Sequence, residues 1–108
     1  VIHDVQLALD EVVTNIVEYG YDDDDEHLID IKFILNEQSL KIIIIDDAKP
    51  YNILDKKDPD TSQSLDEKPI GGLGIYLVKR LMTNIDYDYR DGKNHLLLTK
   101  SFTEGDIN

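Results

Sequence analysis

Residues 40–47 read LKIIIIDD and predict the central strand of the fold. Its four consecutive isoleucines are apolar on both faces of a strand, as expected where a strand is covered by another layer and flanked by neighbours. The strand ends abruptly at Asp46 and Asp47. A preceding strand is predicted over residues 28–35, and the polar turn formers at 36–39 favour a hairpin between the two.

Amphipathic helices are predicted on both sides of this hairpin. Apolar residues recur at helical spacing from residue 4 to 19, and the pattern stops at Gly20, a residue that commonly ends helices. The five acids at 22–26 predict a solvated loop, because they lack the glycine and the closing glutamate of a calcium loop. A second helix is predicted from the glycines at 71–74 through Ile75 to Ile85.

The remaining segments complete the predicted order of elements: helix, two strands, long loop, helix, two strands. Residues 48–70 contain all three prolines and no sustained period, which predicts a long loop of the kind that forms lids or binding loops. In residues 85–90, apolar or aromatic side chains alternate with charged ones, which predicts a strand. A turn is predicted at 91–94, and Leu96 and Leu98 fall in a last strand. We therefore expect a single domain over 1–108, an α+β two-layer sandwich with both helices on one face of a mostly antiparallel sheet.

Composition excludes several classes of protein. The chain has 11 Lys and Arg against 23 Asp and Glu, a net charge of −12, so it is not expected to bind nucleic acid directly. It has no cysteine, which excludes disulfides and thiolate metal sites, and His3, His27 and His95 share no metal-binding spacing. No apolar run approaches the ~18 residues of a membrane span, so we expect a cytoplasmic protein without membrane contact.

Three polar features could carry chemistry. Glu11 and Asn15 lie one turn apart on a polar stripe of the first helix that continues to Glu18, and could act as a general base and a Mg²⁺ ligand. The alternative is a solvated helix face. Asp46, at a strand end, could accept a hydrogen bond from an exocyclic amine such as that of adenine, or could be an ordinary turn residue.

The third feature is the glycine-rich start of the second helix. Gly71, Gly72 and Gly74 would let backbone N–H groups approach an anion at the positive end of the helix dipole. A glycine-rich helix start without a ligand is the alternative. The segment matches neither the P-loop nor the dinucleotide-binding fingerprint.

Together, and in this order, the three features resemble a known family. Glu11-x-x-x-Asn15, Asp46-x-Ala48-x-Pro50 and Gly71-Gly72-Leu73-Gly74-Ile75 are similar to successive boxes of the GHKL ATPases, which have the Bergerat, or histidine-kinase-like, fold. The closest resemblance is to the bacterial anti-sigma factor serine/threonine kinase branch. It covers about residues 5–100.

The resemblance implies a role for each matching residue. Glu11 would activate the attacking hydroxyl, Asn15 would bind Mg²⁺ and Asp46 would read the adenine amine. Residues 48–70 would include the lid. The implied ATP-binding set is completed by Ala48, Pro50, Gly71, Gly72, Leu73, Gly74 and Ile75.

The chain departs from the family pattern at several places. Ala48 stands where the family usually has glycine, and Glu18 stands where many relatives have histidine. The family's leading strand and helix, which contribute to dimerisation and partner docking, are missing before Val1, so the N-terminal end is expected to be incomplete.

A triphosphate ligand also requires positive charge. Lys49, Lys68 and Lys79 are candidates, and Lys68 is preferred because it lies three residues before the glycines, although a solvated lysine is the alternative.

The resemblance implies a Mg·ATP-binding anti-sigma factor that phosphorylates a serine or threonine of a STAS-type anti-anti-sigma partner and sequesters a sigma factor, with a homodimer as a further expectation. The alternative is a catalytically weak nucleotide-binding module that acts by partner binding only, which Ala48 and the missing leading segment favour. A third reading, the ATPase domain of a sensor histidine kinase, is disfavoured by the short lid and by the lack of a preceding phosphoacceptor helix.

Overall fold

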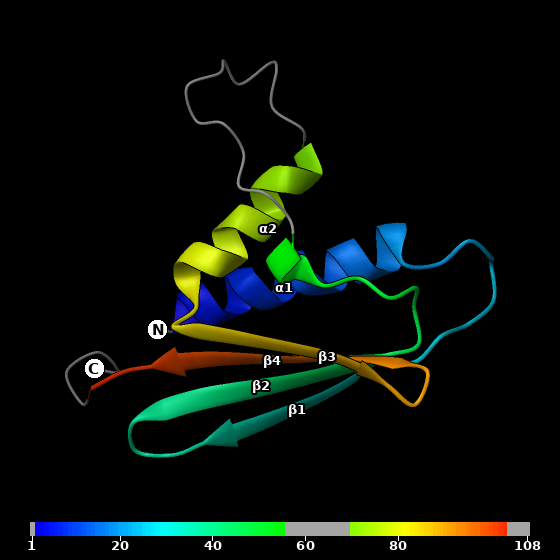
Figure 1. Cartoon of the computed structure of the whole chain (residues 1–108). Helices are drawn as coiled ribbons and strands as arrows, with labels where there is room; N and C mark the ends of the chain where they lie inside the picture. Colours follow the sequence, from blue (N-terminus) through cyan, green and yellow to red (C-terminus); the bar gives the residue numbers. More distant parts are fainter. Residues whose placement is uncertain (1, 56–69, 104–108) are drawn as a thin grey trace.

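The computed structural model of the chain describes residues 2–55 and 70–103. In chain order the elements are α1 (Ile2–Tyr19), β1 (Asp30–Leu35), β2 (Ser39–Asp46), the short 3₁₀ helix η1 (Ile53–Asp55), α2 (Ile70–Leu81), β3 (Asn84–Arg90) and β4 (Lys93–Ser101). Both α-helices lie on the same side of the sheet (Figure 1), which confirms the predicted two-layer α+β sandwich. Neither of these described helices is long and apolar enough to cross a membrane.

The sheet has the strand order β1-β2-β4-β3, and every neighbouring pair is antiparallel. The isoleucine-rich strand β2 therefore lies inside the sheet, as predicted, with β1 on one side and β4 on the other. In this register Asp46, at the end of β2, pairs with Asn94 near the start of β4. The two strands bring these polar side chains together at one end of the sheet.

The core fills the space between the sheet and the two helices. One face of β2 is buried there through Ile42 and Ile44, whereas Ile43 and Ile45 point to the opposite face and are only half-buried. The helical apolar pattern is the buried face of each helix. The buried core residues are Val5, Ala8, Val12, Ile42, Ile44, Ile53, Ile75, Val78, Met82, Leu96 and Leu98.

Helix α1 ends at Tyr19, as the sequence predicts, and Gly20 follows it. The Gly20 amide donates to the Ile16 carbonyl at 2.9 Å. A Cβ atom on Gly20 would lie 2.6 Å from that carbonyl oxygen and 2.7 Å from the Ala48 methyl group. Glycine is therefore required at position 20 by lack of space, and the Ala48 methyl occupies the room that it leaves.

Helix α2 ends at Leu81, four residues before the predicted end, and Ile85 lies in β3 instead. The Lys100 ammonium donates to the Leu81 carbonyl at 2.6 Å and lies 3.4 Å from the Asp4 carboxylate. The Thr83 amide bonds to the Thr99 carbonyl at 2.8 Å, so the chain has already joined the sheet. The apolar periodicity continued past the helix because Ile85 packs against the same core.

The turn between β3 and β4 is shorter than the predicted 91–94. Only Asp91 and Gly92 have positive φ angles, 54° and 74°, the geometry of a two-residue hairpin turn. Lys93 and Asn94 belong to β4, so their prediction as turn residues is wrong. Of the predicted 48–70 lid, residues 56–69 lie outside the described part of the chain.

Candidate functional site

Two adjoining cavities lie beside the polar stripe of α1. The first has a volume of about 280 Å³ and lies between α1, residues 46–53 and the paired strands β3 and β4. The second, about 220 Å³, lies between α1 and α2. Because Asn15 and Tyr19 line both, the two form one elongated site, whose combined size is within the range of ~300–1,000 Å³ typical of small-molecule sites.

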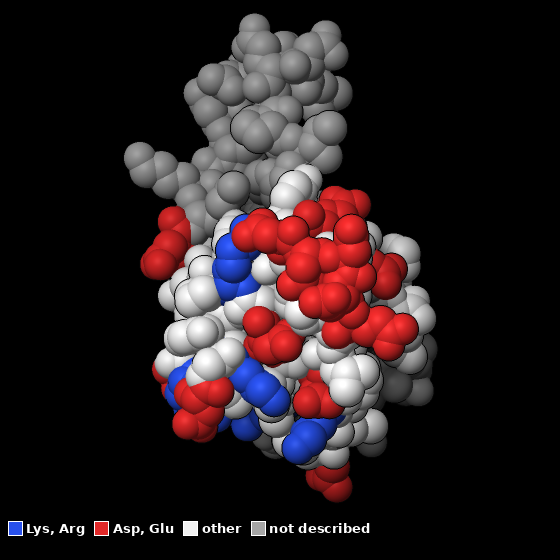
Figure 2. All heavy atoms as spheres, turned by 90° about the vertical axis from the view of Figure 1, so that its right-hand side faces the viewer, with Lys and Arg blue, Asp and Glu red and all other residues white. Residues whose placement is uncertain are grey.

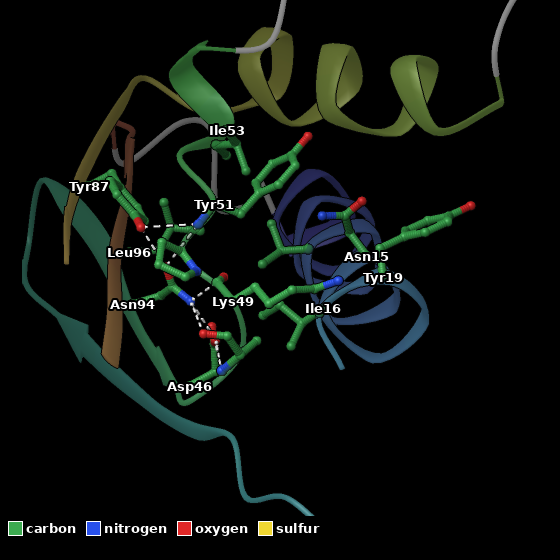
Figure 3. A pocket seen from close by; sticks show the side chains of 14 residues that line it. Asn15, Ile16, Tyr19, Asp46, Lys49, Tyr51, Ile53, Tyr87, Asn94 and Leu96 are labelled. Carbon is green, nitrogen blue, oxygen red and sulfur yellow. Dashed lines mark hydrogen bonds between the residues drawn. The ribbon is translucent and has the colours of Figure 1, made fainter. Parts of the chain in front are cut away.

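The first cavity is an apolar chamber with a polar end. Its walls include Val12, Ile16, Ile53 and Leu96. In Figure 3 Asp46 and Asn94 lie on one side of the chamber, while Asn15 and Ile16 face it from α1 on the other. A flat heterocycle with one polar edge matches this distribution.

Asp46 is almost fully buried, with 4% of its surface exposed. Its Oδ1 accepts hydrogen bonds from the Ala48 amide at 3.0 Å and from Asn94 Nδ2 at 2.9 Å. Among the described residues, both hydrogen bonds that Asp46 accepts use this one oxygen. Oδ2 is therefore the atom with which Asp46 could accept a hydrogen bond from a ligand amine.

Asn94, Tyr51 and Tyr87 also belong to this end of the chamber, and sequence reasoning missed all three. Asn94 Oδ1 accepts a hydrogen bond from the Tyr51 amide at 3.2 Å and one from the Tyr87 hydroxyl. Burial raises the pKa of both tyrosines, so their hydroxyl groups stay protonated at neutral pH. The register Asp46↔Asn94 was the missing signal, because it follows only from the strand order.

The second cavity holds the rest of the α1 polar stripe. Glu11, Asn15 and Glu18 all line it, with Gly74 and Ile75 of α2 on the opposite side. A Cβ atom on Gly74 would collide with Glu11 Oε2. Gly74 therefore leaves the space that the Glu11 carboxylate occupies, and the predicted first and third features meet at this contact.

The other predicted residues have different surroundings. Gly71, Gly72 and Leu73 lie in the first turn of α2, where the first four N–H groups of a helix have no intrahelical partner. Ala48 and Pro50 line the first cavity, the former buried and the latter exposed. Lys68 lies outside the described residues.

Neither described lysine candidate lines the second cavity. The Lys49 ammonium binds the Asp22 carboxylate at 3.0 Å, so its charge faces the acidic loop. Lys79 is close enough to Tyr51 for its charge to oppose the rise in the Tyr51 pKa. In the described residues, the positive charge that a triphosphate requires is therefore sparse around the predicted phosphate region.

The acidic loop is bound to the strand end beside Asp46. The Tyr21 hydroxyl donates to Asp47 Oδ1 at 2.8 Å, and the His27 ring stacks on Tyr21 with a centroid distance of 3.7 Å. His27 Nε2 lies 2.7 Å from Asp23, and its Nδ1 lies 3.3 Å from Asp47. The hydrogen bond to Asp23 raises the pKa of His27. Figure 2, which views the side of the molecule that carries this loop, shows the Asp and Glu side chains gathered there.

The sequence has relatives of known name. Residues 1–100 match the family described as the histidine kinase-like ATPase domain. Serine-protein kinase RsbW of Listeria monocytogenes serotype 4a (strain HCC23) is 24% identical over 110 residues, which cover 98% of this chain and 69% of the relative. Serine-protein kinase RsbW of Bacillus cereus (strain AH187) is 35% identical over 103 residues, covering 92% of this chain and 63% of the relative.

A third relative, Serine-protein kinase RsbW of Bacillus velezensis, is 29% identical over 96 residues, covering 84% of this chain and 59% of the relative. The chain thus spans roughly two thirds of the length of these kinases. The family match covers nearly all of it, including both cavities. The chain therefore belongs to the family of histidine kinase-like ATPase domains.

Proposed function

We propose that the chain binds Mg·ATP and transfers the γ-phosphate to a serine or threonine of a protein partner. Membership of an ATPase-domain family implies the use of ATP. The relatives named serine-protein kinase support protein as the phosphate acceptor. The observation that carries the proposal is the pair of cavities that meet at Asn15, one with Asp46 at its polar end and one with Glu11 at its side.

In this proposal the adenine occupies the first cavity. Its exocyclic amine donates to Asp46 Oδ2, and the apolar walls cover the faces of the ring. The triphosphate extends past Asn15 into the second cavity, toward the free N–H groups at the start of α2. The order of groups along the site matches the order along the nucleotide.

Glu11 is the proposed general base. Its carboxylate takes the proton of the acceptor hydroxyl while the hydroxyl oxygen bonds to the γ-phosphorus and the bond to the β–γ bridging oxygen breaks, releasing ADP. Gly74 leaves the room for this carboxylate beside the start of α2. The base and the phosphate-binding backbone are therefore side by side.

The residues of the second cavity fit a magnesium ion bound mainly by its substrate. Among the described residues, no group of three His, Cys, Asp or Glu side chains could hold a metal ion by itself. The Asn15 side-chain oxygen would supply a protein ligand, and Mg²⁺ commonly takes its other ligands from phosphates and water. The bound ion would neutralise phosphate charge that the sparse lysines leave uncompensated.

The proposed acceptor is a STAS-type anti-anti-sigma protein, and the proposed binding partner is a sigma factor in the cytoplasm. The resemblance to the anti-sigma kinase branch and the names of the relatives support this choice. A homodimer remains a prediction.

The alternative function, a binding module without kinase activity, is favoured partly by Ala48, because its methyl group could obstruct the nucleotide. In the structure this methyl group packs in the space left by Gly20, which weakens that argument against nucleotide binding.

Glu11→Gln tests the proposal because it keeps the size of the side chain and removes the base. The variant should retain Mg·ATP binding, measured by calorimetry, and lose roughly a hundredfold or more of the phosphate transfer rate. Transfer is measured with γ-labelled ATP and a STAS-type protein from the same genome. Asp10→Asn is the matched control, since Asp10 is the adjacent exposed acid on α1 and lines neither cavity.

Two results would contradict the proposal. A wild-type chain that binds no Mg·ATP would remove the nucleotide site. Transfer by Glu11→Gln at the wild-type rate would remove the role of Glu11 as the base.

A further inference from the structure

Asn94 is a buried amide at the centre of the hydrogen bonds around the first cavity. It is 5% exposed, and it faces Asp46 across the β2–β4 pair. Its Nδ2 group donates to Asp46 Oδ1 at 2.9 Å, to the Ala48 carbonyl at 3.2 Å and to the Lys49 carbonyl at 3.1 Å. The two N–H groups of this amide thus donate to three acceptors, so one N–H group is shared between two acceptors.

These partners determine which way the amide of Asn94 points. A flipped amide would place its carbonyl oxygen against a carboxylate and two backbone carbonyls, which are all acceptors. It would also place its NH₂ group against the Tyr51 amide, which is a donor. Only the observed orientation pairs every donor with an acceptor.

Tyr87 extends this arrangement into a chain of hydrogen bonds directed at Asp46. The Tyr51 amide donates to the Tyr87 hydroxyl at 3.2 Å, and the Tyr87 hydroxyl donates to Asn94 Oδ1. Asn94 then donates to Asp46 Oδ1. Figure 3 shows this sequence of contacts along one side of the cavity. Each bond polarises the next, which strengthens the final donor to the carboxylate.

These hydrogen bonds fix the plane of the Asp46 carboxylate and engage one of its two oxygens. Oδ1 accepts from Asn94 on one side and from the Ala48 amide on the other. Without the Asn94 donor the carboxylate keeps a single backbone partner and can rotate about its own axis. Oδ2 would then no longer be held toward a ligand amine.

We propose that Asn94, supported by Tyr87, is a positioning residue that makes the site select for the 6-amino group of adenine. This inference rests on the proposed nucleotide-binding function. It differs from a structural role in one measurable way: the loss of Asn94 should remove the preference for the amino group rather than weaken binding of every nucleotide equally.

The test compares ATP with purine riboside triphosphate, which lacks only the 6-amino group. The wild-type chain should bind Mg·ATP roughly tenfold or more tightly, because the lost hydrogen bond involves a charged acceptor. Asn94→Ala should reduce this preference to within about twofold, with most of the loss on the ATP side. Calorimetry measures both affinities, and circular dichroism checks that the variant is folded.

Tyr87→Phe keeps the inference testable if Asn94→Ala does not fold. It removes only the hydroxyl group, and it should lower the preference for ATP by roughly threefold. Tyr89→Phe is the matched control: Tyr89 lies two residues further along β3, is 43% exposed and does not line the cavity.

Equal loss of affinity for both nucleotides in Asn94→Ala and Tyr87→Phe would overturn the inference and leave Asn94 a structural role. A wild-type chain that binds both nucleotides equally would overturn it as well, by removing the role of Asp46, while nucleotide binding itself would stand. A wild-type chain that binds neither would overturn the proposed function.

Discussion

At the scale of single residues, the contact between Glu11 and Gly74 joins α1 to α2 at the second cavity. Glycine is normally unfavourable inside a helix, by up to ~1 kcal/mol relative to alanine. Here its missing side chain gives the Glu11 carboxylate a place that a methyl group would take. Helix stability and the position of the carboxylate therefore make opposite demands on residue 74.

Gly74→Ala should separate these two demands. The fold should be unchanged or more stable, by up to ~1 kcal/mol, because the atom displaced is the free end of a flexible side chain. Phosphate transfer should fall by roughly a hundredfold, because a displaced base no longer reaches the acceptor hydroxyl. Chemical denaturation and the labelled-ATP assay measure the two effects.

The Glu11→Ala background provides the control for this change. There the Gly74 position has no carboxylate to displace, so adding Gly74→Ala should not lower the residual transfer further. A clear loss of stability in the single Gly74→Ala variant would show that the contact is more rigid than proposed.

The residues of the site differ in how far the sequence could predict them. Helical periodicity places Glu11 and Asn15 on one helix face, and Asp46 stands out as the end of an apolar run. Local sequence patterns are therefore enough to identify all three. Asn94 follows an Asp-Gly turn and has the composition of a turn residue. Its burial depends on its pairing with β2, which is distant in sequence, so no local pattern could identify it.

At the scale of elements, the connection from α1 to β1 is attached to the end of β2. Tyr21 and His27 both contact Asp47, and Lys49 pairs with Asp22. Hydrogen bonding to His27 lowers the pKa of Asp23, and hydrogen bonding to Tyr21 lowers that of Asp47. The acidic loop, predicted to be solvated, is thus held by His27, a residue for which no role was predicted.

The raised pKa of His27 predicts a pH-dependent stability. The stabilisation is fully present below the unfolded-state pKa of about 6.5 and is lost as pH rises through the higher folded-state value. His27→Gln should therefore lower the free energy of unfolding more at about pH 5.5 than at about pH 8.5. Urea denaturation of both chains at the two pH values measures the difference.

His3→Gln serves as the matched control, because His3 is exposed on α1, away from the acidic loop. Comparison with this variant separates the loss of the His27 contacts from the general effect of replacing a histidine. An equal effect of His27→Gln at the two pH values would show that the charge of His27 does not contribute to the contact.

The end of an element could be predicted from the sequence where a residue at that position marks it. Gly20 directly follows the last residue of α1, and this position requires glycine because a side chain there would collide with the Ile16 carbonyl. The end of α2 depends instead on Lys100, which reaches the Leu81 carbonyl from another strand. Apolar periodicity carried the prediction on to Ile85, since β3 uses that side chain in the same core.

At the scale of the whole molecule, the order of elements was enough to predict the layers but not the strand order. The whole chain has a net charge of −12, and the ligand proposed for its site is also an anion. The Asp and Glu side chains of the acidic loop lie on the side shown in Figure 2, and the first cavity adjoins that loop through Gly20 and Lys49. In the proposed function, free ATP would therefore approach a surface that carries charge of its own sign.

This charge predicts an unusual salt dependence. Without magnesium, the affinity for ATP should increase as salt is raised from roughly 0.02 to 0.15 M, because screening reduces repulsion between like charges. A site rich in lysine would show the opposite trend. Adenosine, which is uncharged, is the control, and its affinity should change little over the same range. Calorimetry in the presence of EDTA measures both, and a fall in ATP affinity with salt would contradict the prediction.

The shared position of Asn15 has a further consequence for turnover. In the proposed binding mode, phosphate transfer would change the ligand only in the cavity that holds Glu11, and the base would stay in the chamber that ends at Asp46. ADP would then keep the contacts of its base and compete with ATP for the same chamber. In a cell, the fraction of chains ready to react would follow the ratio of ATP to ADP rather than the amount of ATP alone.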